Sequence, residues 1–124
     1  MDRKPKILIV DDDQTNLRFL NEVLEDDYEI QSVSSGEAAL KTIGSFIPNV
    51  ILLDIMLPGI SGYEVCSKIR EDDSFSDTKI VLISAKAMEK EQKMGFESGG
   101  DAYITKPFDH LNLLEKLDQI LFTT

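Results

Sequence analysis

The chain has 124 residues, of which 42% are hydrophobic and 29% charged, and a formal net charge of −10 at pH 7. This length and composition predict one soluble globular domain, and no apolar run reaches the roughly 18 residues that a membrane-spanning helix needs. The negative charge argues against nucleic acid or an anionic membrane as a partner, because phosphate groups attract lysine and arginine. Cations and basic partners are favoured instead.

The N-terminus and the cysteine content indicate the compartment. MDRKPK is basic, but only the short run ILIV follows before the acidic residues begin, and this is too short for the apolar core of a signal peptide. Cys66 is the single cysteine, which rules out an internal disulfide and a multi-cysteine metal site. We therefore expect a cytoplasmic protein.

Short apolar runs along the chain predict five strands. In chain order they are Lys6–Val10, Tyr28–Val33, Val50–Asp54, Lys79–Ser84 and Asp101–Thr105. Three of these runs are almost continuously apolar, which is typical of strands covered on both faces of a sheet.

Apolar residues spaced by three or four positions predict amphipathic helices between the strands and after the last one. The stripes are Leu17, Leu20 and Leu24; Leu40, Ile43 and Ile47; Val65, Cys66 and Ile69; and Leu114, Leu117 and Leu121. A weaker helix is predicted over Met88–Ser98, where large apolar residues are sparse. Ser34 or Ser35 is expected to cap the second helix, and Asp109 the last.

This alternation of strands and helices predicts an α/β fold in which residues 1–124 form one domain. We expect a doubly wound, five-stranded parallel sheet of flavodoxin-like order 2-1-3-4-5 with five helices. Ligands of such folds bind beyond the carboxyl ends of the strands, near strands one and three. Polar residues end or follow every strand except the second, which this order places at the edge. They are Asp11, Asp12, Asp13, Asp54, Ser84 and Lys106.

The polar set predicts a magnesium site that performs phosphoryl transfer. Neighbouring carboxylates such as Asp11 and Asp12 repel one another unless a cation compensates them, and Mg²⁺ prefers a few carboxylates completed by phosphate oxygens. Asp54, alone at the end of its strand, can act as a nucleophile toward phosphorus. Lys106 can neutralise a phosphoryl oxygen, and the Ser84 hydroxyl can donate to another. Asp13 is expected to face water as the first helix begins.

The chain resembles a receiver domain of two-component response regulators over essentially its whole length. The matching motifs are IVDDD, VILLDIMLPGISG, VLISA and DAYITKPF. The resemblance implies that Asp54 accepts a phosphoryl group from a phosphohistidine of a histidine kinase or phosphotransfer protein. It implies Mg²⁺ bound by Asp11, Asp12, Asp54 and the backbone carbonyl of Met56, with Asp11 acting through water.

The resemblance also implies a switch and an output surface. Ser84 and Lys106 would contact the phosphoryl group, Lys106-Pro107 would be a cis peptide that aims the lysine inward, and Tyr103 occupies the place of the aromatic switch residue. We expect phosphorylation to change the surface of the fourth helix, fifth strand and fifth helix, which could then support a homodimer. The only chemistry expected is self-catalysed phosphorylation and dephosphorylation of the acceptor.

The lifetime of the phosphoryl group depends on the side chains that could hold an attacking water. Met56 lies two residues after the acceptor, and Lys86 two residues after Ser84. A methionine offers no useful hydrogen bond to water, and a lysine can only donate. The sequence therefore predicts slow self-dephosphorylation.

Two alternatives start from the same residues. ILIVDDDQT also resembles the DxDxT signature of haloacid-dehalogenase-type phosphohydrolases, in which Asp11 would be the nucleophile and Asp13 the acid/base. Against this, the chain has no substrate-capping insertion, and Lys106 follows the motif GGD instead of preceding it. The second alternative is a degenerate receiver that acts only as an interaction module, but such a domain would lack an acceptor like Asp54.

Overall fold

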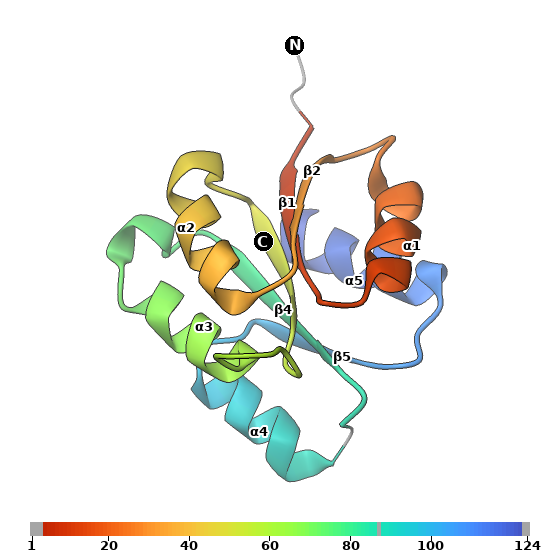
Figure 1. Ribbon diagram of the computed structural model, residues 1–124. Helices are drawn as coiled ribbons and strands as arrows, with labels where there is room; N and C mark the ends of the chain where they lie inside the picture. Colours follow the sequence, from red (N-terminus) through yellow and green to blue (C-terminus); the bar gives the residue numbers. More distant parts are fainter. Residues whose placement is uncertain (1–3, 87, 123–124) are drawn as a thin grey trace.

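The computed structural model describes residues 4–86 and 88–122 and contains a five-stranded parallel sheet (Figure 1). The strands are β1 (Lys6–Val10), β2 (Glu29–Val33), β3 (Val50–Asp54), β4 (Lys79–Ser84) and β5 (Ala102–Thr105). Their order is β2-β1-β3-β4-β5, which confirms the predicted topology. The termini of the predicted 1–124 domain, residues 1–3 and 123–124, lie outside the described residues.

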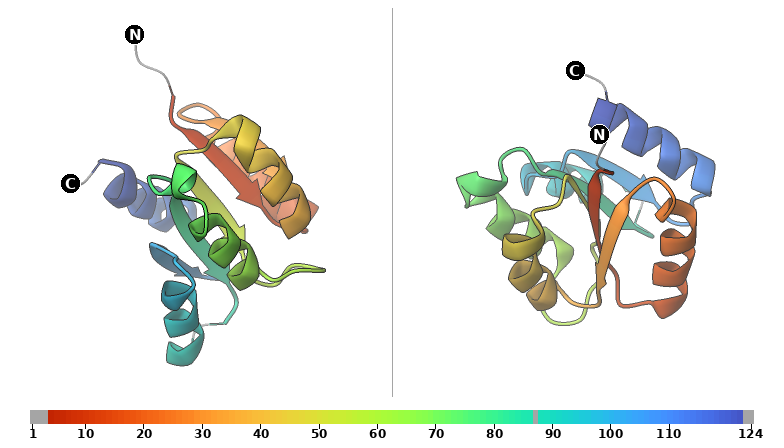
Figure 2. Two further views of the ribbon diagram at one scale, coloured as in Figure 1. Left: turned by 90° about the vertical axis from the view of Figure 1, so that its left-hand side faces the viewer. Right: turned by 90° about the horizontal axis from the view of Figure 1, so that it is seen from above.

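Helices cover both faces of the sheet. They are α1 (Gln14–Leu24), α2 (Gly36–Phe46), α3 (Gly62–Arg70), α4 (Glu89–Glu97) and α5 (His110–Phe122), with a short 3₁₀ turn at Asp73–Phe75. In Figure 2 the sheet lies between α1 and α5 on one side and α2 and α3 on the other. None of the helices in residues 4–86 and 88–122 is long and apolar enough to span a bilayer.

Alternation along the central strands builds a separate core under each helix layer. Ile7 and Ile9 of β1 pack with α1 and α5, whereas Leu8 and Val10 pack with α2 and α3. This follows from the pleat, because successive strand residues point to opposite faces. All residues of β3 are buried, while β2 is largely exposed. The apolar runs thus identified the covered strands, and β2 lies at an edge of the sheet, as the predicted order required.

The predicted helix stripes are confirmed in large part, but Ile47 is a correction. It was expected on the buried stripe of the second helix, yet α2 ends at Phe46 and Ile47 is 58% exposed. Phe46, which is 4% exposed, takes the core position instead. Ser35 rather than Ser34 caps α2, and Asp109 caps α5 by accepting a hydrogen bond from the Asn112 N–H.

The fourth helix is anchored differently from the others. Met88, Met94 and Phe96, its large apolar residues, are 68%, 47% and 49% exposed. Its buried residue is Gly95, where an added Cβ would lie 2.7 Å from the Leu82 side chain on β4. The predicted weakness of this helix therefore has a structural basis, because a glycine contact buries little apolar area.

Ile47 should carry backbone strain that a substitution can relieve. Its φ of 48° is left-handed, a conformation that disfavours β-branched side chains and that asparagine tolerates better. We predict that Ile47→Asn raises the free energy of unfolding by about 1 kcal/mol, measured by chemical denaturation. Ile47→Val keeps the β-branch and should give no gain. A loss of stability in Ile47→Asn would show that the exposed isoleucine makes a contact worth more than the strain.

Candidate functional site

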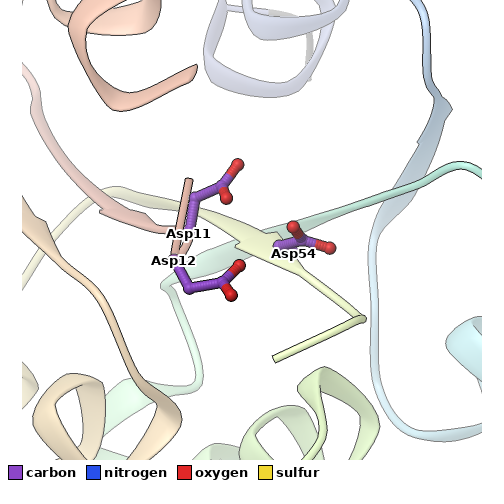
Figure 3. Close-up of side chains that lie close together, drawn as sticks. All are labelled: Asp11, Asp12 and Asp54. Carbon is purple, nitrogen blue, oxygen red and sulfur yellow. The ribbon is translucent and has the colours of Figure 1, made fainter. Parts of the chain in front are cut away.

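Three carboxylates converge beyond the carboxyl ends of β1 and β3. Figure 3 shows Asp11 and Asp12, which follow β1, beside Asp54 at the end of β3. One carboxylate oxygen from each residue lies within 4.8 Å of those of the other two. Asp11 and Asp54 are each 4% exposed, whereas Asp12 is exposed to solvent. The donor set, oxygen atoms of high negative charge with one open side, suits a hard divalent cation such as Mg²⁺.

Lys106 brings a positive charge to the two buried carboxylates. Its Nζ lies 3.0 Å from Oδ2 of Asp54 and 3.5 Å from Oδ2 of Asp11. The Lys106-Pro107 peptide bond is cis, as the sequence resemblance implied. Lys106 follows β5, so these contacts join the end of that strand to the ends of β1 and β3.

Burial and charge act in opposite directions on these groups. Burial raises the pKa of the Asp11 carboxyl above its ordinary value, and the hydrogen bond from Asp13 and the charge of Lys106 oppose this only in part. For Lys106, burial favours the neutral amine, but Asp54 and Asp11 together raise its pKa. The lysine therefore stays protonated at neutral pH, and the site keeps an excess of negative charge that favours a bound cation.

Backbone N–H groups fix the orientation of both buried carboxylates. Oδ1 of Asp54 accepts a 2.9 Å hydrogen bond from the Met56 N–H, and Oδ1 of Asp11 accepts one of the same length from the Asp13 N–H. Asn16, on the first turns of α1, donates from Nδ2 to Oδ2 of Asp11 at 3.3 Å. No pattern in the sequence selects Asn16, because its contact depends on how α1 packs beside β1.

Ser84 lies fully buried at the end of β4. In the β3–β4 register Asp54 pairs with Ile83, so Ser84 lies one residue beyond the partner of Asp54. The Ser84 Oγ accepts a 3.1 Å hydrogen bond from the Lys86 N–H, and its carbonyl accepts one of 2.7 Å from the Lys106 N–H. These bonds join the β4 and β5 ends of the site.

A glycine sets the shape of the loop after Asp54. A Cβ added at Gly62, the first residue of α3, would lie 2.5 Å from the Asp54 carbonyl oxygen and 2.7 Å from the Ile55 Cα. Atoms cannot approach so closely, so only glycine permits α3 to begin against the acceptor strand. The motif VILLDIMLPGISG contains Gly62, but the sequence alone did not indicate this close packing.

The remaining predicted residues are Met56, Lys86, Tyr103 and Asp13. The Met56 N–H donates to Asp54, and the Lys86 N–H donates to Ser84. Both residues are exposed, Met56 to 57%. Tyr103 on β5 donates its hydroxyl to the Lys86 carbonyl at 2.8 Å. Asp13 is exposed, as predicted, and also caps α1 by accepting a 2.9 Å hydrogen bond from the Thr15 N–H.

Known proteins match this chain in sequence and in fold. The family model described as response regulator receiver domain matches residues 7–118. Response regulator ArlR of Staphylococcus aureus is 39% identical over 117 residues, which are 94% of this chain and 52% of the relative. Response regulator PleD of Caulobacter vibrioides is 35% identical over 113 residues, 90% of this chain and 25% of the relative. The chain thus spans about half of one relative and a quarter of the other.

A solved structure agrees with these relatives. The BeF₃-activated receiver domain of DrrB, a protein of Thermotoga maritima, superposes with a TM-score of 0.87 at 34% identity, covering 96% of this chain and 98% of that one. These matches do not support the phosphohydrolase alternative. That reading needed Asp13 as an acid/base, and the Asp13 side chain caps α1 instead.

The carboxylate cluster should make the stability of the protein depend on Mg²⁺. At a concentration 100-fold above its dissociation constant, a ligand that binds only the folded state stabilises it by about 2.7 kcal/mol. We predict that Mg²⁺ raises the melting temperature of the wild type, and that Asp12→Asn loses most of this gain. The measurement is thermal unfolding with a Mg²⁺ titration.

Asp13→Asn is the matched control for this titration. It removes the same charge from the neighbouring position, and asparagine caps a helix as well as aspartate does. It should therefore keep most of the Mg²⁺ response. Equal losses in both variants would mean that the response reflects the overall negative charge rather than the cluster.

Proposed function

The chain belongs to the family of response regulator receiver domains, and we propose that Asp54 is its phosphoacceptor, charged by a histidine kinase or phosphotransfer protein. One observation carries this proposal. Asp54 is buried between the Asp11–Asp12 pair and Lys106, with Nζ of the lysine 3.0 Å from Oδ2. This is the charge environment that in-line phosphoryl transfer needs around its nucleophile.

In the proposed reaction, a carboxylate oxygen of Asp54 attacks phosphorus. The new bond is O–P, the bond that breaks is P–N of the donor phosphohistidine, and its electron pair returns to the imidazole. The Lys106 ammonium, which forms an ion pair with Asp54, would then contact a phosphoryl oxygen instead. The buried Ser84 hydroxyl would donate a hydrogen bond to another phosphoryl oxygen. The Met56 N–H keeps the acceptor carboxylate in place throughout.

Receiver domains bind Mg²⁺ at an acidic pocket, and the proposed ligands here are Asp11, Asp12, Asp54 and the backbone carbonyl of Met56, with Asp11 acting through water. The ion would supply positive charge against the phosphoryl oxygens. The chain's own part is to hold Asp11 and Asp54 in fixed orientations through the backbone bonds of Asp13 and Met56. The catalysis proposed for the domain is limited to its own phosphorylation and dephosphorylation.

We propose that the signal leaves through the surface of α4, β5 and α5. A phosphoryl oxygen that draws the Ser84 hydroxyl would shift the end of β4, and Tyr103 lies on the neighbouring strand. The hydroxyl of Tyr103 already reaches the loop after β4, at the Lys86 carbonyl. Phosphorylation-dependent homodimerisation through this surface is part of the proposal, and the exposed Met88 and Phe96 of α4 would add apolar area to it.

We place this activity in the cytoplasm, without nucleic acid or membrane as a direct partner of residues 1–124. The net charge of −10 would repel phosphate groups, and the single cysteine suits a reducing compartment. The match covers 52% of ArlR and 25% of PleD, so the proposal concerns the receiver domain and not the output of a whole regulator.

Mg²⁺-dependent labelling of Asp54 tests the phosphoacceptor assignment. We predict that incubation with Mg²⁺ and a small phosphoryl donor adds one phosphoryl group, detected by intact mass and mapped as a labile adduct. Asp54→Asn should abolish the adduct, because an amide oxygen is a poor nucleophile, while Asp13→Asn should retain it. An adduct that persists in Asp54→Asn would show that another residue is the acceptor.

The residue two positions after the acceptor should control the lifetime of this adduct. The Met56 side chain is 57% exposed beside Asp54 but cannot orient an attacking water, whereas asparagine offers both a donor and an acceptor. We predict that Met56→Asn loses the label about ten-fold faster, a barrier change of about 1.4 kcal/mol, measured by intact mass against time. Met56→Leu, which also lacks hydrogen-bonding groups, should match the wild type. Unchanged or slower loss in Met56→Asn would contradict this account.

A further inference from the structure

Two tyrosine hydroxyls hold the N-terminal part of α4 and the loop before it. Tyr63, in the first turn of α3, donates to the backbone carbonyl of Glu91 at 3.0 Å. Tyr103 donates to the Lys86 carbonyl at 2.8 Å. The first bond joins α3 to α4, and the second joins β5 to the loop that leads into α4. Both rings pack against the same hydrophobic core.

The Tyr63 hydroxyl is a permanent donor at physiological pH. Burial, the neighbouring Tyr103 hydroxyl and the nearby Glu91 raise the pKa of Tyr63 to about 12. The phenol therefore remains protonated, and its hydrogen bond to the Glu91 carbonyl does not depend on pH in the neutral range.

Apart from these bonds, α4 is weakly attached. Within the described residues, no side chain caps its N-terminus, and its large apolar residues are exposed. Oε2 of Glu91 is buried and has no hydrogen-bond partner in the described part of the chain. A buried carboxylate oxygen without a donor destabilises the arrangement that buries it. The hydrogen bond from Tyr63 therefore stabilises the position of α4, and the unpartnered Oε2 of Glu91 destabilises it.

We propose that Tyr63 is a positioning residue that latches α4 to α3 beside Tyr103, and that the buried, unpartnered Oε2 of Glu91 keeps this latch releasable. The effect on signalling rests on the proposed phosphoacceptor function, because phosphorylation of Asp54 would have to move α4 against the latch. The latch itself is a property of the unmodified protein. A small bias from the site is then enough to shift α4, since a net hydrogen bond of this kind is modest.

Removing the Tyr63 hydroxyl tests the latch directly. The measurement is amide hydrogen exchange of the intact chain without Mg²⁺ or a phosphoryl donor. Tyr63→Phe keeps the ring in the core, and we expect exchange in Glu89–Glu97 to become about five-fold faster, while the central strands keep wild-type rates. Tyr28→Phe is the matched control, because Tyr28 packs in the core on the opposite face of the sheet. Wild-type exchange in α4 of Tyr63→Phe would overturn the proposal.

The Glu91 carboxylate gives an independent test with the opposite sign. Glu91→Gln removes the charge from the buried position, so α4 should exchange more slowly than in the wild type. Glu89→Gln is the control, because Glu89 is exposed and lies in the same first turn, so the two variants change the helix-dipole interaction alike. Equal exchange rates in the two variants would refute the contribution of the buried carboxylate.

A third arm separates the latch from the phosphoacceptor function. With Mg²⁺ and beryllofluoride as the phosphoryl mimic, the wild type should show a larger change of α4 exchange than Tyr63→Phe, whose α4 is already loosened. Intact mass after labelling with a phosphoryl donor is read on the same samples. Labelling of Asp54 with equal α4 changes in both proteins would overturn the latch alone. Absence of labelling would refute the phosphoacceptor function, while the comparison of unmodified proteins would still decide the latch.

Discussion

The ion pairs of Lys106 with Asp11 and Asp54 are the contacts on which the site depends. Two carboxylates that are each 4% exposed lie close together, and a single lysine contacts both. Burial of like charges is unfavourable unless opposite charge compensates it, and here one positive charge faces an excess of negative charge. The imbalance favours a divalent cation at the carboxylates. In the proposed reaction, that cation and the lysine together would offset the charge of the added phosphoryl group.

The fold surrounds Asp54 with tightly packed elements on one side and with a weakly packed helix on the other. β3 is wholly buried, and Gly62 allows α3 to begin directly against the Asp54 backbone, so the acceptor has little freedom. On the other side of the same face, α4 contacts the sheet through Gly95 and is attached by the Tyr63 hydroxyl. Elements that move during signalling come from such weakly packed parts of a domain. The contrast explains how a local change of charge can alter one surface and leave the core intact.

The sequence was sufficient for the topology and for the proximity of the polar residues that follow the strands, for one geometric reason. The apolar runs identified the strands, and in a parallel sheet the carboxyl ends of all strands lie on the same side of the domain. Residues that end or follow these strands must therefore lie near one another, whatever the detailed packing. For this reason the three carboxylates and Lys106 could be selected before any contact was known, and the structure brings all four together.

The tertiary structure decided everything that depends on contacts between distant segments. The periodicity that placed Ile47 in the core could not reveal that α2 ends one residue earlier, with Phe46 buried instead. The motif DDDQT by itself fits two chemistries, and the tertiary structure adds that the Asp13 side chain caps α1. The bond from Tyr63 to Glu91 spans 28 positions of the chain, and no local pattern encodes it. Sequence periodicity predicts on which face of a helix or strand a residue lies. The residue that it contacts there depends on how the helices pack on the sheet.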